Sequence, residues 1–535
     1  MKKLRKNYSV ERMIGIVLLF LAIILFLTRG INEIDNTVIG YDEAYNATVS
    51  ANFAKYDEYK VSYPSDIIFY NKITTGQTVL VPTAILYRLL GINDLTSAIV
   101  PLLYGCGCFV ILFVLLCQLF EKNKICHIIS SILASLTLLS DFYFFYYSTH
   151  LIGEAAALFF ILLSTLGIVL YNKKKQEKYM LLSGAAIIAT YITKSSMIFV
   201  LITFWGVVFI ASFLEKKFSK KAFVFFAIGN VFSFVILDLI KFIQLGGLKN
   251  YIKWYKDEWY NMINQSSGID TTMSLAEKMG TFQTLLSKNA VINIFLITIP
   301  VVVYVGIFIC NILKKKDILK RLTAFVFLGI AGSSLLIYYI LLGGAGLNYP
   351  RRLSVNTIII KIYWILFLIE IFNVCMKKSE NQIKLKYLSK VLLACVLLGV
   401  ISYLTILPLD VLKDSYKRYT NYYEEPEYSY KLMQKFLKEV NELPEDATLY
   451  VNDWWQEPDV TLFLGRKMIN LKSVDSNTIR KENSYLIVGQ YFVGDLESIW
   501  TDWKINLKEI DKIDVDFEKI TWPYANWSYT IFEIS

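Results

Sequence analysis

The stretch Gly40-Tyr-Asp-Glu-Ala-Tyr-Asn-Ala-Thr-Val-Ser-Ala-Asn-Phe53 follows the first long apolar run of the chain and holds two adjacent acids, Asp42 and Glu43. Charges at the edge of a membrane span are costly unless they find a partner or a task. Small and apolar residues recur at helical spacing, which predicts a helix with Asp42 at or near its N-terminus, where a carboxylate is favoured. We expect the rest of the chain to be organised around this acid.

Composition decides the class of protein. The chain has 535 residues, of which 55% are hydrophobic and only 19% charged, and its mean hydropathy is +0.46. These values predict a polytopic α-helical membrane protein. The apolar run 14–27 follows a basic N-terminus but leads into a polar stretch without a small-residue cleavage site, so we interpret it as an uncleaved anchor.

Several classes of site are disfavoured. All seven cysteines fall in or beside apolar runs, without disulfide or zinc spacing. His127 and His150 are the only histidines, which leaves little room for a histidine metal site or a Ser-His-Asp triad. The net charge of +10 is concentrated in short loops between apolar runs, so we expect no nucleic-acid partner.

Eleven apolar runs are long enough, with their flanks, to cross about 30 Å of hydrocarbon. They are residues 14–27, 96–120, 125–139, 155–170, 179–193, 197–213, 222–243, 290–313, 322–342, 353–372 and 391–407.

The run 74–91 is ambiguous, because it is apolar in the middle but contains Gln77, Pro82 and Arg88. If it does not cross, the basic loops all lie on the cytoplasmic side with the N-terminus, as the positive-inside rule asks. These loops are 121–124, 172–178, 215–221, 314–321 and 376–390. We therefore interpret 74–91 as an interfacial or re-entrant element. The alternative is a twelfth helix.

This topology puts most polar features on the outer side of the cytoplasmic membrane. They include the first loop, the loop 141–154, the end of the fifth helix, the loop 245–289, the loop 343–352 and everything after residue 410. No nucleotide pool exists there, so an enzyme on this face needs a lipid-borne substrate.

The candidate acids have simpler interpretations beside the catalytic one. Glu43 is either catalytic or a solvated or helix-facing partner. Glu154 opens the fourth helix, where a carboxylate also stabilises the N-terminus by about 0.3–1 kcal/mol. Asp141 lies at a helix end in what we expect to be a wet loop, and needs no special role.

The candidate cations lie opposite. Lys194 follows an apolar helix, and Arg351 and Arg352 follow a glycine-rich loop that ends in Tyr349-Pro, so that Tyr349 joins them as a substrate-binding candidate. Arginine grips a phosphate bidentately, whereas lysine supplies a point charge. The alternative is snorkelling at helix ends, but basic residues are disfavoured on the outer side. Lys361 lies roughly mid-helix and is a candidate for a pocket or an ion pair.

Three segments resemble the GT-C glycosyltransferases of family 39, the group of protein O-mannosyltransferases and lipid A aminoarabinose transferase. They are Gly-Tyr-Asp-Glu-Ala-Tyr at 40–45, the segment 72–91 and Tyr191-Ile-Thr-Lys194. The resemblance covers essentially the whole membrane part, in order. It implies a GT-C fold and transfer of a sugar from a polyprenyl-phosphate donor at the outer membrane face, usually with inversion. The acceptor would be a lipid, a protein or a cell-wall glycan.

The resemblance also implies roles. The family's first-loop acid falls on Asp42, as general base; its second-loop acid falls on Glu154, its lysine on Lys194 and its late arginine on Arg351 or Arg352. A divalent cation between Asp42 and Glu154 is left open.

Two departures stand out. The second-loop acid is usually Asp, but here it is Glu in Ile-Gly-Glu. Many relatives have Lys-Pro-Pro-Leu-Tyr where this chain has Thr-Thr-Gly-Gln-Thr, so that Lys72 is the stand-in for a binding lysine.

The tail changes character. An amphipathic helix through Leu432, Phe436 and Val440 precedes strand candidates at 447–451, 484–489 and 528–532. We predict a small α/β domain outside the membrane at 410–535, after a GT-C transmembrane catalytic domain at 1–409 whose first outer loop, 29–95, carries juxtamembrane helices.

The alternative function is a polytopic transporter or a flippase for lipid-linked sugars. It would predict charges near the membrane midplane and paired broken helices. Lys361 supplies one such charge and Asn356 a neutral polar group, whereas acids and bases gathered on one face with a soluble domain favour an enzyme. A third possibility is a catalytically inactive scaffold.

Overall fold

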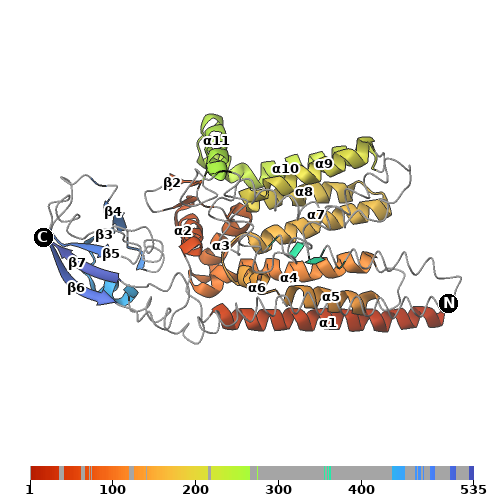
Figure 1. Ribbon diagram of the computed structural model, residues 1–535, viewed down its shortest axis with the longest axis horizontal. Coiled ribbons are helices and arrows are strands. Elements are labelled where there is room, and N and C mark those ends of the chain that lie inside the picture. Colours follow the sequence, from red (N-terminus) through yellow and green to blue (C-terminus); the bar gives the residue numbers. More distant parts are fainter. Residues whose placement is uncertain are drawn as a thin grey trace.

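The computed structural model shows an elongated molecule with a helical bundle and a separate C-terminal sheet (Figure 1). It describes residues 2–34, 41–61, 67–71, 73, 75–119, 126–139, 141–214, 218–264 and 274, six positions between 355 and 365, and the parts of the tail at 436–451, 464–466, 468–471, 474, 482–488, 506–513 and 529–535.

Seven helices run side by side along the long axis of the bundle (Figure 1). They are α1 (Lys2–Ile34), α4 (Asp94–Leu119), α5 (Cys126–Leu139), α7 (Glu154–Lys174), α8 (Lys178–Thr193), α9 (Ile198–Phe209, continued by a π-helical turn at Ile210–Leu214) and α10 (Lys220–Gln244). They correspond to the first seven predicted spans. Three of the other four lie wholly outside the described residues, and 353–372 is described only at six positions, all helical.

The chain is a helical membrane protein with several apolar spans. Within the described residues, five helical segments are long and apolar enough to cross a membrane. In α7, 78% of the apolar window is buried within the protein, against 28% in α1 and 22% in α10. Helix α7 is therefore central, whereas α1 and α10 present wide apolar faces to the surroundings, as spans in contact with lipid do.

Helices α8 and α10 approach closely because small residues lie between them. A Cβ atom at Gly184 would lie 2.0 Å from the Phe226 carbonyl oxygen, and one at Gly229 would lie 2.2 Å from that of Leu181. Small residues at a helix contact allow this approach in apolar surroundings, where dispersion contacts drive association.

One end of the bundle carries the short elements (Figure 1). They are α2 (Tyr41–Tyr56), the β1–β2 hairpin (Lys60–Val61 and Ile67–Ile68), α3 (Gln77–Leu90), α6 (Phe142–Thr149), the 3₁₀ turn η1 (Ser195–Met197) and α11 (Leu248–Asn264). Helix α3 has only 14 residues and lies with α2 at this end rather than along the bundle. That it does not cross the membrane remains a prediction. The loop expected at 141–154 contains α6, whose N-cap is Asp141.

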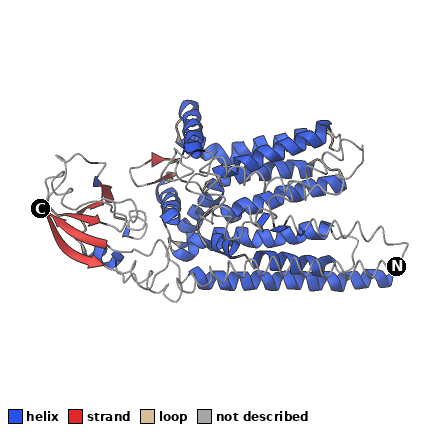
Figure 2. Ribbon diagram, viewed as in Figure 1, coloured by secondary structure: helices blue, strands red, loops and turns tan. Residues whose placement is uncertain are grey.

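The C-terminal part is a mixed five-stranded sheet in the order β4-β3-β5-β7-β6, and Figure 2 separates its strands from the helical bundle. The strands are β3 (Thr448–Val451), β4 (Met468–Asn470), β5 (Ser484–Val488), β6 (Leu507–Ile513) and β7 (Tyr529–Ile534). Strand β3 is parallel to β4 and β5, whereas β7 is antiparallel to β5 and β6. The predicted strands β3, β5 and β7 are confirmed, and residues 436–442 are helical with Phe436 and Val440 fully buried. Strands β4 and β6 were not predicted.

Candidate active site at one end of the bundle

The two adjacent acids lie in the first turn of α2, which begins at Tyr41. This confirms the predicted position of Asp42 near a helix N-terminus. The side chain of Asp42 lies outside the described part of the structure, whereas that of Glu43 is described and is only 7% exposed.

Glu43 joins α2 to the segment between α6 and α7. Its Oε1 accepts a hydrogen bond of 2.6 Å from the Leu151 backbone N–H, and its Oε2 lies 3.8 Å from His150 Nε2. Asn46, one turn further along α2, donates from Nδ2 to the Leu151 carbonyl oxygen at 2.7 Å. The Glu43 side chain thus faces the protein rather than solvent.

The acid that opens α7 and the lysine that directly follows α8 form an ion pair between Glu154 Oε1 and Lys194 Nζ. Residues 40 positions apart in the sequence, predicted separately, thus meet at one point. Their side chains are only 11% and 16% exposed. The second oxygen, Oε2, is buried and has no hydrogen-bond partner among the described residues. This carboxylate therefore retains one acceptor for another group.

The segment before α3 holds Lys194 from the other side. Thr75 forms an isolated β-bridge with Lys194, and the Gly76 N–H donates to the Thr193 carbonyl oxygen at 2.9 Å. A Cβ atom at Gly76 would lie 1.7 Å from the Ile192 carbonyl oxygen, so only glycine allows this approach. Thr78 Oγ1 lies 2.6 Å from Thr193 Oγ1. Residues 75–78 of the Thr-Thr-Gly-Gln-Thr segment, which departs from the pattern of the family that the sequence resembles, thus dock beside Lys194.

Lys361 is in an ion pair, one of its two predicted alternatives. Its Nζ contacts Asp141 Oδ2, while Asp141 Oδ1 accepts from the Phe144 N–H at 3.0 Å and so caps α6. The expectation that Asp141 lies in a wet loop is wrong, because Asp141 is only 5% exposed. A buried lysine needs a counter-charge, and Asp141 supplies it.

Sequence reasoning missed a second charged cluster at the end of α10 that leads into α11. Asp238 lies 2.9 Å from Lys241 Nζ and accepts a hydrogen bond of 2.9 Å from Gln77 Nε2. The hydroxyls of Tyr251 and Tyr255 on α11 both donate to Asp238 Oδ2. The signal was an Asp and a Lys three residues apart inside an otherwise apolar run.

Aromatic rings enclose the lysine of this cluster. Lys241 Nζ lies 3.7 Å from the ring centre of Trp254 and 4.8 Å from that of Tyr255, distances typical of cation–π contacts. The Trp254 indole N–H donates to the Phe69 carbonyl oxygen next to β2. The cluster therefore ties α10, α11 and the hairpin together. Trp254 and Tyr255 supply the rings of this contact.

A further buried carboxylate, that of Glu258 on α11, interacts with Ser195 of η1. Burial raises the pKa of its carboxyl, while a hydrogen bond with the Ser195 side chain and the charge of Lys241 oppose the shift. Its Oε2 is buried and has no hydrogen-bond partner in the described part of the chain. Glu258 thus joins α11 to the residue next to Lys194.

The remaining predicted site residues lie outside the described residues: Lys72, Tyr349, Arg351 and Arg352. No group of three or more His, Cys, Asp or Glu side chains that could hold a metal ion occurs among the described residues. A cation between Asp42 and Glu154, which the sequence left open, is not tested, because the Asp42 side chain lies outside the described part of the structure. On the Glu154 side, Oε2 is a suitable hard ligand, but Lys194 already neutralises the carboxylate.

Comparisons with solved structures give similar folds at low identity. The chain is similar to ArnT from Cupriavidus metallidurans bound to undecaprenyl phosphate, with 11% identity, a TM-score of 0.49 and coverage of 98% of this chain and 97% of that one. It is also similar to the Archaeoglobus fulgidus oligosaccharyltransferase in complex with Zn and sulfate, with 12% identity, a TM-score of 0.47 and coverage of 90% and 68%. No protein-family model and no curated protein sequence matches the chain.

Proposed function

We propose that this protein is a membrane glycosyltransferase that transfers a sugar from a polyprenyl-phosphate donor to an acceptor at the outer membrane face. The observation that carries the proposal is the Glu154–Lys194 pair, at the end of the bundle where α2 brings Asp42. Its Oε2 is buried without a hydrogen-bond partner among the described residues. The sequence resemblance of the segments around Asp42, 72–91 and Lys194 points to the same reaction. The C-terminal sheet lies at this end as well (Figure 1).

The residues have distinct roles in this proposal. Asp42 orients the acceptor hydroxyl and takes its proton as the sugar is transferred. The departing polyprenyl phosphate needs no proton, but its charge must be stabilised, which suits Lys194 with Arg351 and Arg352. Glu154 fixes Lys194 in place and offers Oε2 to a hydroxyl group of the substrate.

Glu43 is a positioning residue in this scheme. It holds the backbone at Leu151, three residues before Glu154, and so fixes the start of α7 relative to the first turn of α2. In this proposal Asp42 is the catalytic acid of the adjacent pair, and Glu43 positions the backbone.

The competing transporter hypothesis rested chiefly on Lys361. That lysine is paired with Asp141, which also caps α6, so its charge is committed within the protein. The described acids and bases of the site instead gather at one end of the bundle. We therefore favour the enzyme over a transporter or a flippase.

The test is transfer of radiolabelled sugar from polyprenyl-phosphate sugars in membranes that contain equal amounts of wild type, Asp42→Asn or Lys194→Met. General-base catalysis contributes about 10²–10⁴-fold to rate, so we expect a loss of that order in Asp42→Asn. The control is Asp57→Asn, because Asp57 is an exposed acid that pairs with Arg88 on α3.

The outcomes separate the hypotheses. Loss in Asp42→Asn with wild-type transfer in Asp57→Asn would support the proposal. Equal transfer by Asp42→Asn and wild type would remove Asp42 from the mechanism. No transfer by wild type, across several donor sugars and lipid, protein and glycan acceptors, would favour the transporter.

A further inference from the structure

Helix α11 presents three separate surfaces around its circumference. One is an exposed apolar stripe of Leu248, Ile252 and Trp259, whose exposed fractions are 62%, 46% and 51%. At about 100° per residue these three positions fall within about 40° of one another, on one side of the helix. Soluble surfaces rarely expose such a row of large apolar side chains without a partner.

A second stripe of α11 is basic. It consists of Lys249, Lys253 and Lys256, which lie at helical spacing next to the apolar stripe and are all exposed. Tyr260, 68% exposed, belongs to the same stripe. A row of lysines along the edge of an apolar stripe is the pattern of a helix that lies in a membrane interface, with the amines at the level of the headgroups.

The third surface fixes the rotation of α11 about its own axis. Tyr251 and Tyr255 donate to Asp238 on α10, Trp254 donates to the Phe69 carbonyl oxygen, and Glu258 hydrogen-bonds with Ser195. These contacts face the protein, so the apolar and basic stripes must face away from it.

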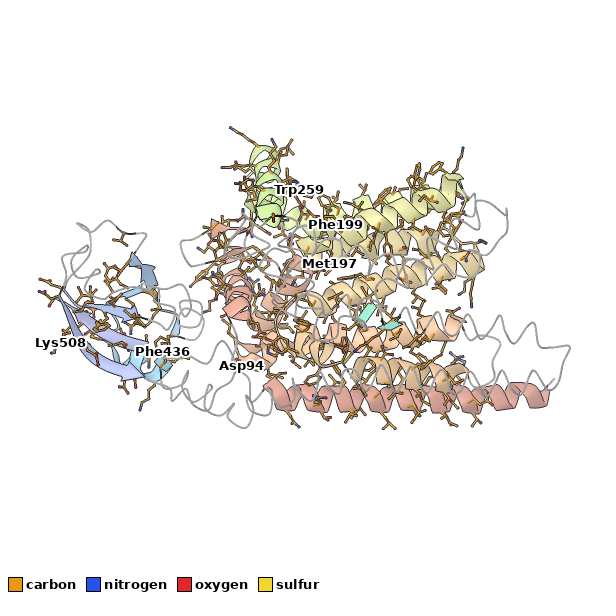
Figure 3. All side chains as sticks on the ribbon, viewed as in Figure 1. Asp94, Met197, Phe199, Trp259, Phe436 and Lys508 are labelled. Carbon is orange, nitrogen blue, oxygen red and sulfur yellow. The ribbon has the colours of Figure 1, made fainter. Side chains whose placement is uncertain are left out.

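The apolar stripe continues a lipid-facing surface. Large apolar side chains are exposed along α10 up to its end, namely Val224, Ile228, Val231, Phe232, Val235, Ile236, Leu239, Phe242 and Ile243. Two glycines, Gly246 and Gly247, both with positive φ, turn the chain directly after α10. Helix α11 then leaves the end of α10 at a steep angle, away from the bundle (Figure 1), and carries Trp259, labelled in Figure 3. A helix in this position lies along the membrane surface if α10 crosses the membrane.

We propose that α11 is a docking surface for anionic phospholipid, with its apolar stripe at the boundary between headgroups and acyl chains and Lys249, Lys253 and Lys256 on lipid phosphates. The basic stripe complements negative headgroups, and continuity with the exposed face of α10 points to lipid rather than to another protein. The inference does not depend on the transferase reaction. It adds a membrane contact on α11, and Glu258 links this helix to Ser195, the residue next to Lys194.

The experiment is photo-crosslinking from single positions of α11. Benzoylphenylalanine would replace Ile252 or Trp259, and in matched controls Asn250 or Asp257, which are also exposed but lie on the opposite side of the exposed surface. The full-length protein would be irradiated in nanodiscs of equal phosphatidylcholine and phosphatidylglycerol, and adducts identified by intact mass. Because all four positions are exposed, we expect each variant to fold like the wild type.

We expect lipid adducts at positions 252 and 259, several-fold more than at 250 and 257, with phosphatidylglycerol enriched. The enrichment should fall to the composition of the disc in a variant that also carries Lys249→Gln, Lys253→Gln and Lys256→Gln. Equal lipid adducts at all four positions, or adducts with a second copy of the chain in place of lipid, would overturn the proposal. Lipid adducts without enrichment in the presence of the three lysines would overturn the assignment of anionic lipid.

Discussion

Glu43 holds the backbone of the segment between α6 and α7. Its Oε1 satisfies the Leu151 N–H, and Leu151 is 1% exposed. An unsatisfied buried N–H costs about 1–3 kcal/mol. We expect Glu43→Ala to lower the free energy of unfolding by this amount. Glu43→Gln keeps a carbonyl acceptor and should be close to wild type in both stability and transfer. Thermal unfolding in detergent and the transfer assay measure the two effects; a loss of transfer in Glu43→Gln as large as in Asp42→Asn would make Glu43 catalytic.

The Glu154–Lys194 pair should show strong coupling, because both side chains are largely buried. Removing one partner of a buried ion pair leaves an uncompensated charge and costs about 3–5 kcal/mol. We expect Glu154→Gln and Lys194→Met each to destabilise the protein, and the double variant to be more stable than the sum of the single effects predicts. A double-mutant cycle on the free energy of unfolding measures this coupling. Additive effects would show that the two charges do not interact.

Glu258 should make stability depend on pH. Burial raises the pKa of its carboxyl above the unfolded value of about 4.3. The folded protein therefore binds more protons between the two pKa values, so the contribution of this group to stability is present at low pH and is lost as the pH rises through the folded pKa. Glu258→Gln cannot ionise and still accepts from Ser195. We expect the variant to unfold at a higher temperature than wild type at neutral pH, and the difference to shrink toward about pH 4.

The matched control for Glu258 is Asp257→Asn, at an exposed neighbouring acid on the same helix. This variant should follow the wild-type pH profile. A wild type as stable as Glu258→Gln at neutral pH would show that the buried carboxylate has a compensating partner.

At the scale of elements, the contact between α8 and α10 depends on two glycines. A Cβ atom introduced at Gly184 or Gly229 would lie 2.0 or 2.2 Å from a backbone oxygen, which cannot move aside as a side chain does. We expect Gly184→Ala and Gly229→Ala to destabilise the protein by about 1–3 kcal/mol, the usual range for overpacking. Gly206→Ala in α9 is the control, because no described atom would lie within 4 Å of its Cβ. Equal unfolding temperatures for the three variants would contradict a tight α8–α10 contact.

Which elements could be predicted follows from their length and surroundings. Long apolar runs specify the spans α1, α4, α7 and α10 because hydrocarbon imposes length and composition on a helix. Helix α6 was missed because it has eight residues within a segment that we took for a loop. Helix α11 is amphipathic and carried a helical signal, but it was missed because the whole segment 245–289 was interpreted as a loop.

The site was predictable residue by residue but not as an arrangement. The sequence indicated Glu154 and Lys194 separately, because each is a charge beside an apolar helix. Only the fold shows that α7 and α8 bring the two side chains together. The charges of Asp238 and Lys241 neutralise each other within one helical turn. The run 222–243 was therefore predicted as a span, and the pair was not recognised as part of a site. The contact of Glu43 with Leu151 joins positions 108 apart and had no local signal.

At the scale of the whole molecule, the predicted cytoplasmic loops and the proposed site lie at opposite ends of the bundle (Figure 1). The predicted cytoplasmic loops hold lysines such as Lys174 at the end of α7, whereas the proposed site, α11 and the C-terminal sheet lie at the other end (Figure 1). The positive-inside rule predicts that the site and the sheet lie outside the cytoplasmic membrane. This orientation fits a donor carried by a lipid, since no soluble nucleotide sugar is present on that side.

The orientation is testable with single cysteines at two exposed lysines on opposite ends of the molecule. The Lys508 side chain, on β6 and labelled in Figure 3, is 79% exposed, and Lys174 is exposed at the end of α7. We expect a membrane-impermeant maleimide to label Lys508→Cys in intact spheroplasts and Lys174→Cys only after the membrane is permeabilised. The wild type corrects for its native cysteines, of which Cys108 is buried and Cys106 and Cys117 are partly buried among the described residues. The reverse pattern would put the sheet and the Glu154–Lys194 pair on the cytoplasmic side, where soluble sugar nucleotides are present, and would remove the main reason for a lipid-linked donor.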